Sequence, residues 1–330
     1  GGANTAAAHH LTPEDRGLCV LPLCHINGQV VTVMGPLLSG SSVVMPSRFR
    51  VSMFWDWVSV HRCTWFSAVP TIISYLLGAQ EAGSNPEKNI LAHVRFGRSA
   101  SAALPPAVHT AFVERFGIPL VETMGITDTA APILSNPLNP KAHRIGSPGK
   151  SCGNEVRIAD ERSMELESGS EGEIQIRGHN IMKGYLKDPE KTREAFTQDG
   201  WYRTGDLGQM DQDGYVFVTG RIKELIIKGG KNIAPREIDD VLYQFPGVLE
   251  AAVVGVFDSR YGEEVVACVV ASPGNLIDVD ALRAHCEKNL GRFKTPSVFH
   301  LMETLPKGPS GKIQRLKLVD EIQKSNAGNG

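Results

Sequence analysis

Four stretches in the second half of the chain decide how the sequence is interpreted. They are Trp201-Tyr202-Arg203-Thr204-Gly205-Asp206, Gly220-Arg221-Ile222-Lys223-Glu224, Lys228-Gly229-Gly230-Lys231-Asn232-Ile233 and Pro306-Lys307-Gly308-Pro309-Ser310-Gly311-Lys312-Ile313-Gln314-Arg315. A carboxylate such as that of Asp206 can accept hydrogen bonds from two neighbouring hydroxyls. Adjacent glycines allow a tight loop with positive φ, and a lysine on a polar loop can carry a compact ammonium into a closed site. Taken singly, each feature also fits a surface turn or a solvated charge.

Upstream of these stretches, short apolar segments alternate with helical patterns. We expect strands at 18–23, 42–45, 64–67, 94–97 and 119–121, and helices at 28–38, 51–62, 70–78 and 105–116. Alternation at this spacing predicts an α/β fold, with a mostly parallel sheet and helices on its faces.

The pattern changes after residue 145. Short strands at 155–158, 172–177, 205–210 and 215–220, with turn residues between them, predict a small antiparallel, barrel-like subdomain over about 145–220. From residue 223 onward, strands at 225–227, 248–257, 265–271 and 298–301 and helices at 235–245 and 279–290 predict a compact α+β module. We therefore expect a large domain over 1–222 and a small C-terminal domain over 223–330.

The overall composition excludes several classes of protein. The chain has 330 residues, of which 42% are hydrophobic and 21% are charged, and a formal net charge of −2. That charge provides no global basic field for nucleic acid, and no apolar run is long enough to predict a membrane span. The six cysteines form no CxxC pair, which favours reduced, buried thiols in a cytoplasmic protein. His9 and His10 lack the further ligands that a metal site needs.

In their order and spacing, the four stretches resemble those of the acyl-adenylate-forming superfamily, which includes acyl-CoA synthetases, luciferases and peptide-synthetase adenylation domains. The resemblance implies an AMP-forming acyl-CoA synthetase that uses ATP, Mg²⁺ and CoA to activate a small-molecule carboxylate. It implies that Asp206 and Arg221 bind the nucleotide and that Lys312 is the catalytic lysine of adenylation. It also implies a hinge at Lys223, and a loop at Gly229 and Gly230 that lines the tunnel for CoA.

A looser resemblance continues upstream. His25 matches a residue that flanks the acyl pocket. Ser99 and Ala100 match a small-residue loop beside adenine and substrate. The segment Met124-Gly125-Ile126-Thr127-Asp128 matches one whose threonine contacts phosphate and whose acidic residue binds Mg²⁺. Met124 stands where the family has an aromatic residue, which alters adenine stacking. Asp128 stands where the family has glutamate, so its carboxylate has a shorter stem.

Arg144 belongs to a stretch that looks closest to the small-acid branch containing oxalyl-CoA synthetases. A cation there would suit a second carboxylate on the substrate, and an arginine solvated on a loop is an equal alternative.

One hallmark of the family does not occur before His25, namely the Gly-rich Ser/Thr loop that cradles phosphates. Its absence leaves three interpretations: a piece of a longer enzyme, a chain complemented by a separate N-terminal segment, or a non-catalytic homologue that binds nucleotide or acyl-adenylate. We favour the first and also expect that a homodimer could form. An adenylation domain that loads a carrier protein, and an interaction module that uses an open sheet edge, remain alternatives.

Overall fold

The computed structural model describes residues 1–78, 91–309 and 311–327. Its first sheet has seven strands in the order β2-β1-β3-β4-β5-β6-β7. Their bounds are β1 Arg16–Cys19, β2 Ser42–Val44, β3 Trp65–Ala68, β4 Phe96–Ser99, β5 Leu120–Ile126, β6 Ala131–Ser135 and β7 Lys150–Ser151. Strands β1 to β5 pair in parallel, whereas β6 and β7 continue the sheet antiparallel. The predicted mostly parallel sheet is confirmed.

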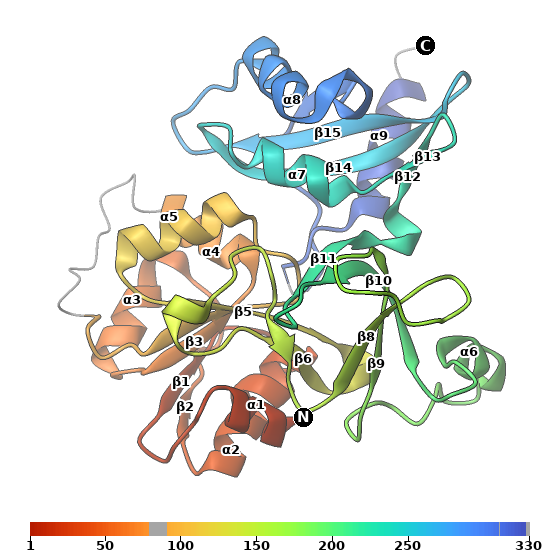
Figure 1. The fold of residues 1–330 in the computed structure, drawn as a ribbon. Helices are drawn as coiled ribbons and strands as arrows, with labels where there is room; N and C mark the ends of the chain where they lie inside the picture. The colour runs from red at the N-terminus through yellow and green to blue at the C-terminus, as the bar shows by residue number, and fades with distance from the viewer. Residues whose placement is uncertain (79–90, 310, 328–330) are drawn as a thin grey trace.

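Helices cover both faces of this sheet (Figure 1). Their bounds are α1 Gly2–Ala8, η1 Asn27–Met34, α2 Gly35–Ser39, α3 Val51–Val60, α4 Pro70–Gly78, α5 Pro106–Phe116, and the short turns η2 Thr127–Thr129 and η3 Pro140–Ala142. Helices α3, α4 and α5 bury Phe54, Ile73 and Phe112 in one core. On the other face, Val31 from η1 packs with Trp65 and Phe96. Burial of these apolar side chains on both faces favours the parallel arrangement.

The helix predicted at 28–38 is formed, but its first part is a π-helix, η1, which runs directly into α2. Gly28 lies so close to the preceding segment that an added Cβ would sit 2.4 Å from the carbonyl oxygen of Pro22. Thr32 donates a hydrogen bond to the carbonyl oxygen of Gly28 at 2.6 Å. The wider turn directs the side chain of Asn27 to the sheet, where it contacts Ser67 and Arg98. Such π-helical turns are frequent at functional sites.

A second, antiparallel sheet has the order β11-β10-β9-β8. Its strands are β8 Glu155–Ala159, β9 Gly172–Arg177, β10 Tyr202–Met210 and β11 Val216–Arg221, and helix α6 covers Pro189–Ala195. Its core contains Ile174, Ile176 and Val216. The antiparallel unit predicted over about 145–220 corresponds to this sheet.

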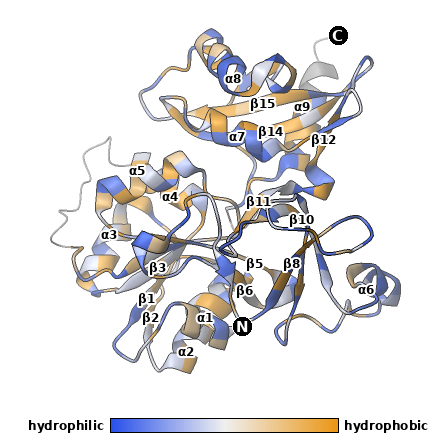
Figure 2. Cartoon of the chain, in the orientation of Figure 1, coloured by the Kyte–Doolittle hydropathy of each residue, from blue (hydrophilic) through white to orange (hydrophobic). Residues whose placement is uncertain are grey.

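The C-terminal unit is built on a third sheet in which β13, β12, β15 and β14 follow one another and β16 pairs with β15. Its elements are η4 Ile222–Glu224, β12 Ile226–Lys228, β13 Lys231–Ile233, α7 Pro235–Leu242, β14 Val248–Asp258, β15 Gly262–Ala271, α8 Val279–Lys294, β16 Val298–Leu301 and α9 Arg315–Ala327. Two cores flank the long hairpin of β14 and β15, whose hydrophobic residues stand out in Figure 2. This unit lies above the other two sheets in Figure 1.

Every predicted strand and helix overlaps an observed one, and the differences concern short or polar elements. The sequence reasoning missed α1, α6, α9, β6, β7 and β13. The predicted helix at 279–290 ends beside Gly291, whose φ of 72° interrupts the helical backbone of α8. A positive φ is readily adopted only by glycine, so the chain turns there.

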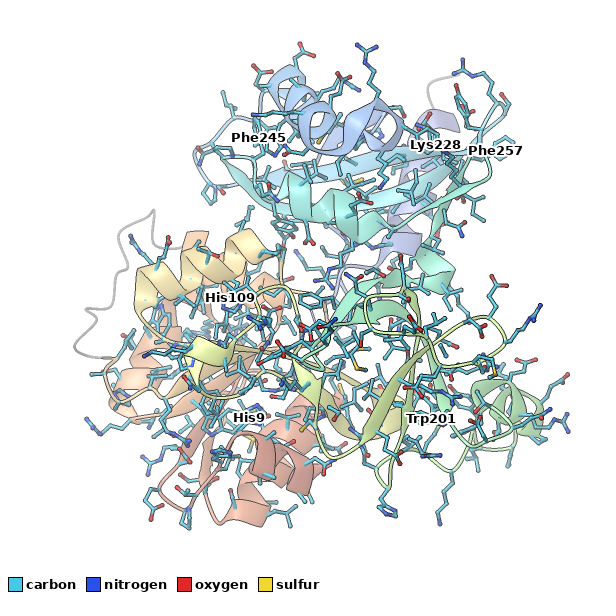
Figure 3. All side chains as sticks on the ribbon, in the orientation of Figure 1. His9, His109, Trp201, Lys228, Phe245 and Phe257 are labelled. Carbon is cyan, nitrogen blue, oxygen red and sulfur yellow. The ribbon has the colours of Figure 1, made fainter. Side chains whose placement is uncertain are left out.

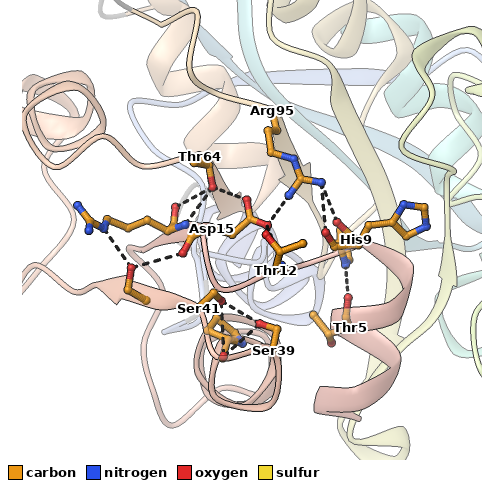
Figure 4. A network of polar contacts seen from close by, with 12 residues as sticks. Thr5, His9, Thr12, Asp15, Ser39, Ser41, Thr64 and Arg95 are labelled. Atoms are coloured by element: carbon orange, nitrogen blue, oxygen red, sulfur yellow. Dashed lines mark hydrogen bonds and ion pairs between the residues drawn. The ribbon is translucent and has the colours of Figure 1, made fainter.

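Buried polar contacts fix the start of the chain to the first sheet. Asp15 pairs with Arg95 at 2.5 Å and accepts a hydrogen bond from Thr64 at 2.7 Å (Figure 4). His9 is fully buried and its Nδ1 lies 2.8 Å from the carbonyl oxygen of Thr5. These contacts explain why the residues that precede β1 are ordered.

The expectation of buried thiols is met at five of the six cysteines, while Cys24 is exposed on the segment between β1 and η1. All six are free. Within the part of the chain that the structure describes, no helix is long and apolar enough to cross a membrane.

Candidate active site

A cavity of about 250 Å³ lies where the three sheets meet. It is lined by residues from the carboxyl ends of β4 and β5, from β10 and β11, and from the C-terminal unit. Those that matter here are Ser99, Ser101, Thr123, Met124, Gly125, Asp206, Arg221, Asp240 and Lys312. Ligands of open α/β sheets bind beyond the carboxyl ends of the strands, so this is the expected place for a site.

Asp206 and Arg221 form a salt bridge in the cavity wall. They are partners in the pairing of β10 with β11, and Arg221 Nε lies 2.7 Å from Asp206 Oδ1. Burial raises the pKa of the Asp206 carboxyl, and the positive charge of Arg221 opposes that shift. Thr204 holds the turn because its hydroxyl donates to the carbonyl oxygen of Ile174 at 2.7 Å. The pair therefore presents a carboxylate and a guanidinium to the cavity from a rigid hairpin.

Lys312 enters the same cavity on the loop before α9. Thr71, at the start of α4, donates a hydrogen bond to the carbonyl oxygen of Gly311 at 3.0 Å, and the N–H of Gly308 donates one to the carbonyl oxygen of Lys312 at 2.8 Å. The Lys312 side chain meets solvent in the cavity, yet the surrounding protein desolvates its ammonium enough to lower the pKa, and Arg221 adds to that effect. The neighbouring Ser310 lies outside the described residues.

Thr127 and Asp128 follow Gly125 on η2, at the end of β5. Thr127 is exposed and Asp128 is half-buried, and neither side chain lines the cavity. The Asp128 backbone is fixed by Met182, whose N–H donates to its carbonyl oxygen at 2.7 Å. The described residues hold no group of three metal-ligating side chains. A single carboxylate fits Mg²⁺, which keeps several waters and binds substrate phosphates.

His25 lies close to Lys312. Burial lowers the pKa of the His25 imidazole, and the positive charge of Lys312 lowers it further. Its Nδ1 accepts a hydrogen bond from the backbone N–H of Asn27 at 3.3 Å, just before η1. Ser99 lines the cavity with a buried hydroxyl for which residues 1–78, 91–309 and 311–327 provide no hydrogen-bond partner, and Ala100 is buried next to it in the chain. Of these three predicted residues, Ser99 alone belongs to the cavity lining.

Comparison with known proteins decides the family. A family model described as "AMP-binding enzyme" matches residues 2–186, and one described as "AMP-binding enzyme C-terminal domain" matches residues 237–312. The chain belongs to the AMP-binding enzymes. This confirms the resemblance to acyl-adenylate-forming enzymes.

The relatives of this AMP-binding enzyme include two small-acid ligases. A sulfoacetate–CoA ligase from Cupriavidus necator is 56% identical over 97% of this chain and 62% of its own length. An oxalate–CoA ligase from Arabidopsis thaliana is 39% identical over 94% of this chain and 60% of its own length. The chain thus spans about 60% of the curated relatives that it matches.

The solved structure of ATP-bound MatB from Rhodopseudomonas palustris superposes on the AMP-binding enzyme with a TM-score of 0.89 at 32% identity, over 98% of this chain and 63% of that one. Apo MatB from the same organism, at 33% identity and the same coverage, gives a TM-score of 0.75. The described fold is therefore nearer to the ATP-bound arrangement.

Like Thr127 and Asp128, the predicted site residues Gly229, Gly230 and Arg144 of the AMP-binding enzyme do not line the cavity. Gly229 and Gly230 form the turn between β12 and β13, with φ of 55° and 74°. This turn follows Lys228, which Figure 3 places at the outer end of the C-terminal unit. Arg144 pairs instead with Asp213 at 3.0 Å, and its side chain is 51% exposed. That position does not support the predicted role of Arg144 in the acyl pocket.

Lys223 is exposed on η4, the short turn that joins the second sheet to the third. A hinge must lie in such a connection, because a few residues there absorb the change in backbone angles. The position is compatible with the predicted hinge.

Sequence reasoning predicted Lys312 of the C-terminal unit but missed the charged side chains that α7 contributes to the cavity. Arg236 donates from its guanidinium to the carbonyl oxygens of Val218 and Gly146, which lie outside that unit. Asp240, four residues on, lines the cavity; burial raises its pKa to about 6, which Arg236 only partly offsets. The polar start of α7, Arg236-Glu237-Ile238-Asp239-Asp240, was the available signal.

Proposed function

We propose that this chain carries the nucleotide site and catalytic lysine of an AMP-forming acyl-CoA synthetase for a small carboxylic acid. The observation that carries the proposal is the meeting of Lys312 with Asp206 and Arg221 in one cavity. Asp206 and Arg221 are paired on the second sheet, whereas Lys312 comes from a loop of the C-terminal unit, 106 positions after Asp206 and 91 after Arg221. The two small-acid ligases among the relatives support the same function.

In the first half-reaction, a substrate carboxylate oxygen attacks the α-phosphorus of ATP, and pyrophosphate leaves with the electron pair of the broken P–O bond. Asp206 accepts hydrogen bonds from the ribose hydroxyls, and Arg221 fixes the carboxylate of Asp206 while adding positive charge. The Lys312 ammonium stabilises negative charge on the α-phosphate and the carboxylate, and the Thr127 hydroxyl contacts phosphate. Catalysis then consists mainly of positioning and electrostatic stabilisation.

Further residues complete the proposed site. Asp128 would hold Mg²⁺, which supplies positive charge to the phosphates when it is bound. Met124 and Gly125 line the cavity together with Ser99, and they would contact adenine, with Ala100 behind them. His25 lies beside Lys312 and would flank the acyl group.

In the second half-reaction, the CoA sulfur attacks the acyl carbon, the thiol proton is released, and AMP leaves. We propose that residues 223–330 rotate about Lys223 relative to residues 1–222, so that Gly229 and Gly230 replace Lys312 at the cavity. Two observations support this step: the Gly229–Gly230 turn lies outside the cavity while Lys312 is inside, and the fold superposes better on ATP-bound than on apo MatB.

The test is carboxylate-dependent exchange of pyrophosphate into ATP, followed by thioester formation with CoA or with a pantetheinylated carrier protein. Oxalate, sulfoacetate, acetate and octanoate are the acids to compare. We expect Lys312→Ala to lower exchange roughly 10²- to 10³-fold while ATP affinity changes little. The matched control is Lys317→Ala, an exposed lysine on α9 outside the cavity.

Two outcomes would contradict the ligase proposal. One is protein that binds ATP but exchanges pyrophosphate with none of the acids, which is the behaviour of a non-catalytic binder. The other is an equal loss in Lys312→Ala and Lys317→Ala. Thioester formation with the carrier protein but not with CoA would favour the carrier-loading alternative.

A further inference from the structure

Arg98 is a fully buried arginine for which the described residues provide no acidic partner. It occupies β4, one residue before Ser99 of the cavity wall, and is 2% exposed. Its Nη1 donates to Asn27 Oδ1 at 2.6 Å and to Ser67 Oγ at 3.0 Å, both neutral groups. Its Nε is buried and has no hydrogen-bond partner among the residues that the structure describes. A buried cation normally has a paired anion, because the loss of hydration is otherwise uncompensated.

Groups that face Arg98 do not supply the missing charge. His9 is buried beside it, and burial lowers the pKa of that imidazole to about 3, with Arg98 contributing to the shift. Cys152 is also near, and burial raises the pKa of its thiol. Both groups are therefore neutral at pH 7. Burial lowers the pKa of Arg98 itself to about 9, so its guanidinium still carries a charge at pH 7.

The nearby Arg95, unlike Arg98, has an acidic partner in the described part of the chain, and this partner compensates its positive charge. Arg95 lies three residues earlier, is more exposed than Arg98, and pairs directly with the carboxylate of Asp15 (Figure 4). Within the described residues, Arg98 donates to an amide oxygen and a hydroxyl oxygen but to no carboxylate. The loss of hydration of its guanidinium is therefore less well compensated than that of Arg95.

Polar contacts connect Arg98 to the cavity. The Asn27 amide that accepts from Arg98 also donates to Ser101 Oγ at 3.3 Å, and Ser101 lines the cavity. Ser101 has a φ of 73°, an uncommon conformation for a residue with a side chain. Thr123, two residues beyond the partner of Arg98 on β5, lines the cavity from the same face of the sheet. Arg98 thus lies beneath the cavity wall at the carboxyl end of the sheet.

We propose that Arg98 recognises a second anionic group, carboxylate or sulfonate, on the acid that the enzyme activates. The proposal rests on the proposed ligase function and adds the substrate class: short acids that carry two negative charges. One anion is the reacting carboxylate beside Lys312, and the other is bound by the guanidinium of Arg98. A planar guanidinium suits this task because it can donate two parallel hydrogen bonds to one carboxylate.

The decisive experiment compares acids with one and two charges on three proteins: wild type, Arg98→Met and Arg144→Met. Arg144→Met is the matched control, since it removes an arginine that is exposed and already paired. The readout is the kcat/KM of pyrophosphate exchange for oxalate, malonate and sulfoacetate against acetate and propionate. We expect Arg98→Met to lower kcat/KM for the dianions roughly 10- to 100-fold, mainly through KM, and to leave the monoanions within a few-fold.

Arg98→Lys keeps a charge without the planar fork, so we expect it to retain part of the preference for dianions. A loss with oxalate and malonate would show that Arg98 recognises a carboxylate, and a loss with sulfoacetate would show that it recognises a sulfonate. Equal losses for all five acids in Arg98→Met would mean a structural arginine and would overturn the proposal. An unchanged dianion preference in Arg98→Met, or the loss of it in Arg144→Met, would overturn it as well.

A binding measurement separates this proposal from the ligase function. Thermal unfolding of wild type and Arg98→Met is followed with oxalate, sulfoacetate or acetate in the absence of ATP. We expect the two dianions to raise the Tm of the wild type only. If no acid supports exchange but this pattern appears, the ligase proposal fails and the anion site stands. If exchange proceeds but dianions protect both proteins equally, the anion site fails and the ligase proposal stands.

Discussion

Two arginines, one buried in the first sheet and one partly buried at the start of α9, are satisfied in opposite ways. Arg315 is held by Asp239, by Glu224 at 3.3 Å and by the carbonyl oxygen of Val253 at 2.7 Å. Among the described residues, the side-chain hydrogen-bond partners of Arg98 are a neutral amide and a hydroxyl. Arg315 completes a network of the C-terminal unit that itself borders the cavity, whereas Arg98 lies behind the cavity lining and retains unused hydrogen-bonding capacity at its Nε.

The difference separates a structural charge from a functional one. Removing one partner of a buried ion pair leaves the other charge uncompensated, so a paired arginine is needed for stability. An arginine without a carboxylate raises the free energy of the folded state, and that cost is relieved when an anion binds. Stability and ligand preference should therefore respond oppositely at the two positions.

The largest expected effect is on the stability of the Arg315→Met variant. Because the substitution leaves the buried carboxylate of Asp239 without its cation, we expect a loss of about 3–5 kcal/mol in the free energy of unfolding. Arg98→Met should change it by no more than about 1 kcal/mol, since Asn27 Oδ1 still accepts from Ser67 Oγ. Urea unfolding measures both. Equal losses of unfolding free energy in the two variants would contradict the distinction between the paired Arg315 and the unpaired Arg98.

Asp240 tests an intermediate case, a carboxylate whose partner Arg236 lies 3.6 Å away. Its folded-state pKa of about 6 is above that of an unfolded aspartate, so the folded protein binds the extra proton. Protonation of Asp240 therefore contributes to the free energy of unfolding in full below about pH 4, and this contribution is lost as the pH rises through 6.

We therefore expect Asp240→Asn to be about 1–2 kcal/mol more stable than wild type at pH 8 and nearly equal at pH 4. Urea unfolding of both proteins between pH 4 and pH 8 measures the difference in their free energies of unfolding. The same pH dependence in both proteins would mean that Arg236 fully compensates Asp240.

The smallest effect concerns a lysine that is already paired. Lys307 binds Glu250 at 2.7 Å and the hydroxyl of Tyr75 on α4 at 2.9 Å. Tyr75→Phe removes one hydrogen bond and leaves the ion pair intact, so we expect a loss of about 0.5–1.5 kcal/mol.

Lys307→Met is the companion variant. It strands Glu250, which is 2% exposed, and should be clearly more destabilising than Tyr75→Phe in the same urea measurement. If Tyr75→Phe were the more damaging of the two, the contact between α4 and the C-terminal unit would outweigh the ion pair.

The sequence predicted those parts of the site that depend on local motifs. Asp206, Arg221 and Lys312 reach one cavity because a hairpin and a short loop place them, and both are visible in the turn residues. The parallel sheet followed from apolar segments at regular spacing. Periodicity was sufficient to predict the sheet, whereas the roles of Asp206, Arg221 and Lys312 were implied by the resemblance of their motifs to a known family.

Features that depend on tertiary arrangement were not predicted. Gly229 and Gly230 lie away from the cavity because the orientation of the C-terminal unit decides which of its loops enters, and no local pattern encodes that orientation. Arg98 escaped notice because its isolation depends on β3, β4 and η1 together. An arginine between Gly97 and Ser99 in an otherwise apolar strand was the available signal.

Because η1 is a π-helix, the orientation of Asn27 depends on the number of residues in this segment as well as on their identity. A π-turn holds one more residue than an α-turn, so deleting a residue between Asn27 and Met34 would let the segment relax into an α-helix. That shift would rotate the preceding residues by about 100° and turn Asn27 away from Arg98. Homologues that differ by a single deletion there should therefore differ in ligand preference even when every side chain of the cavity is identical.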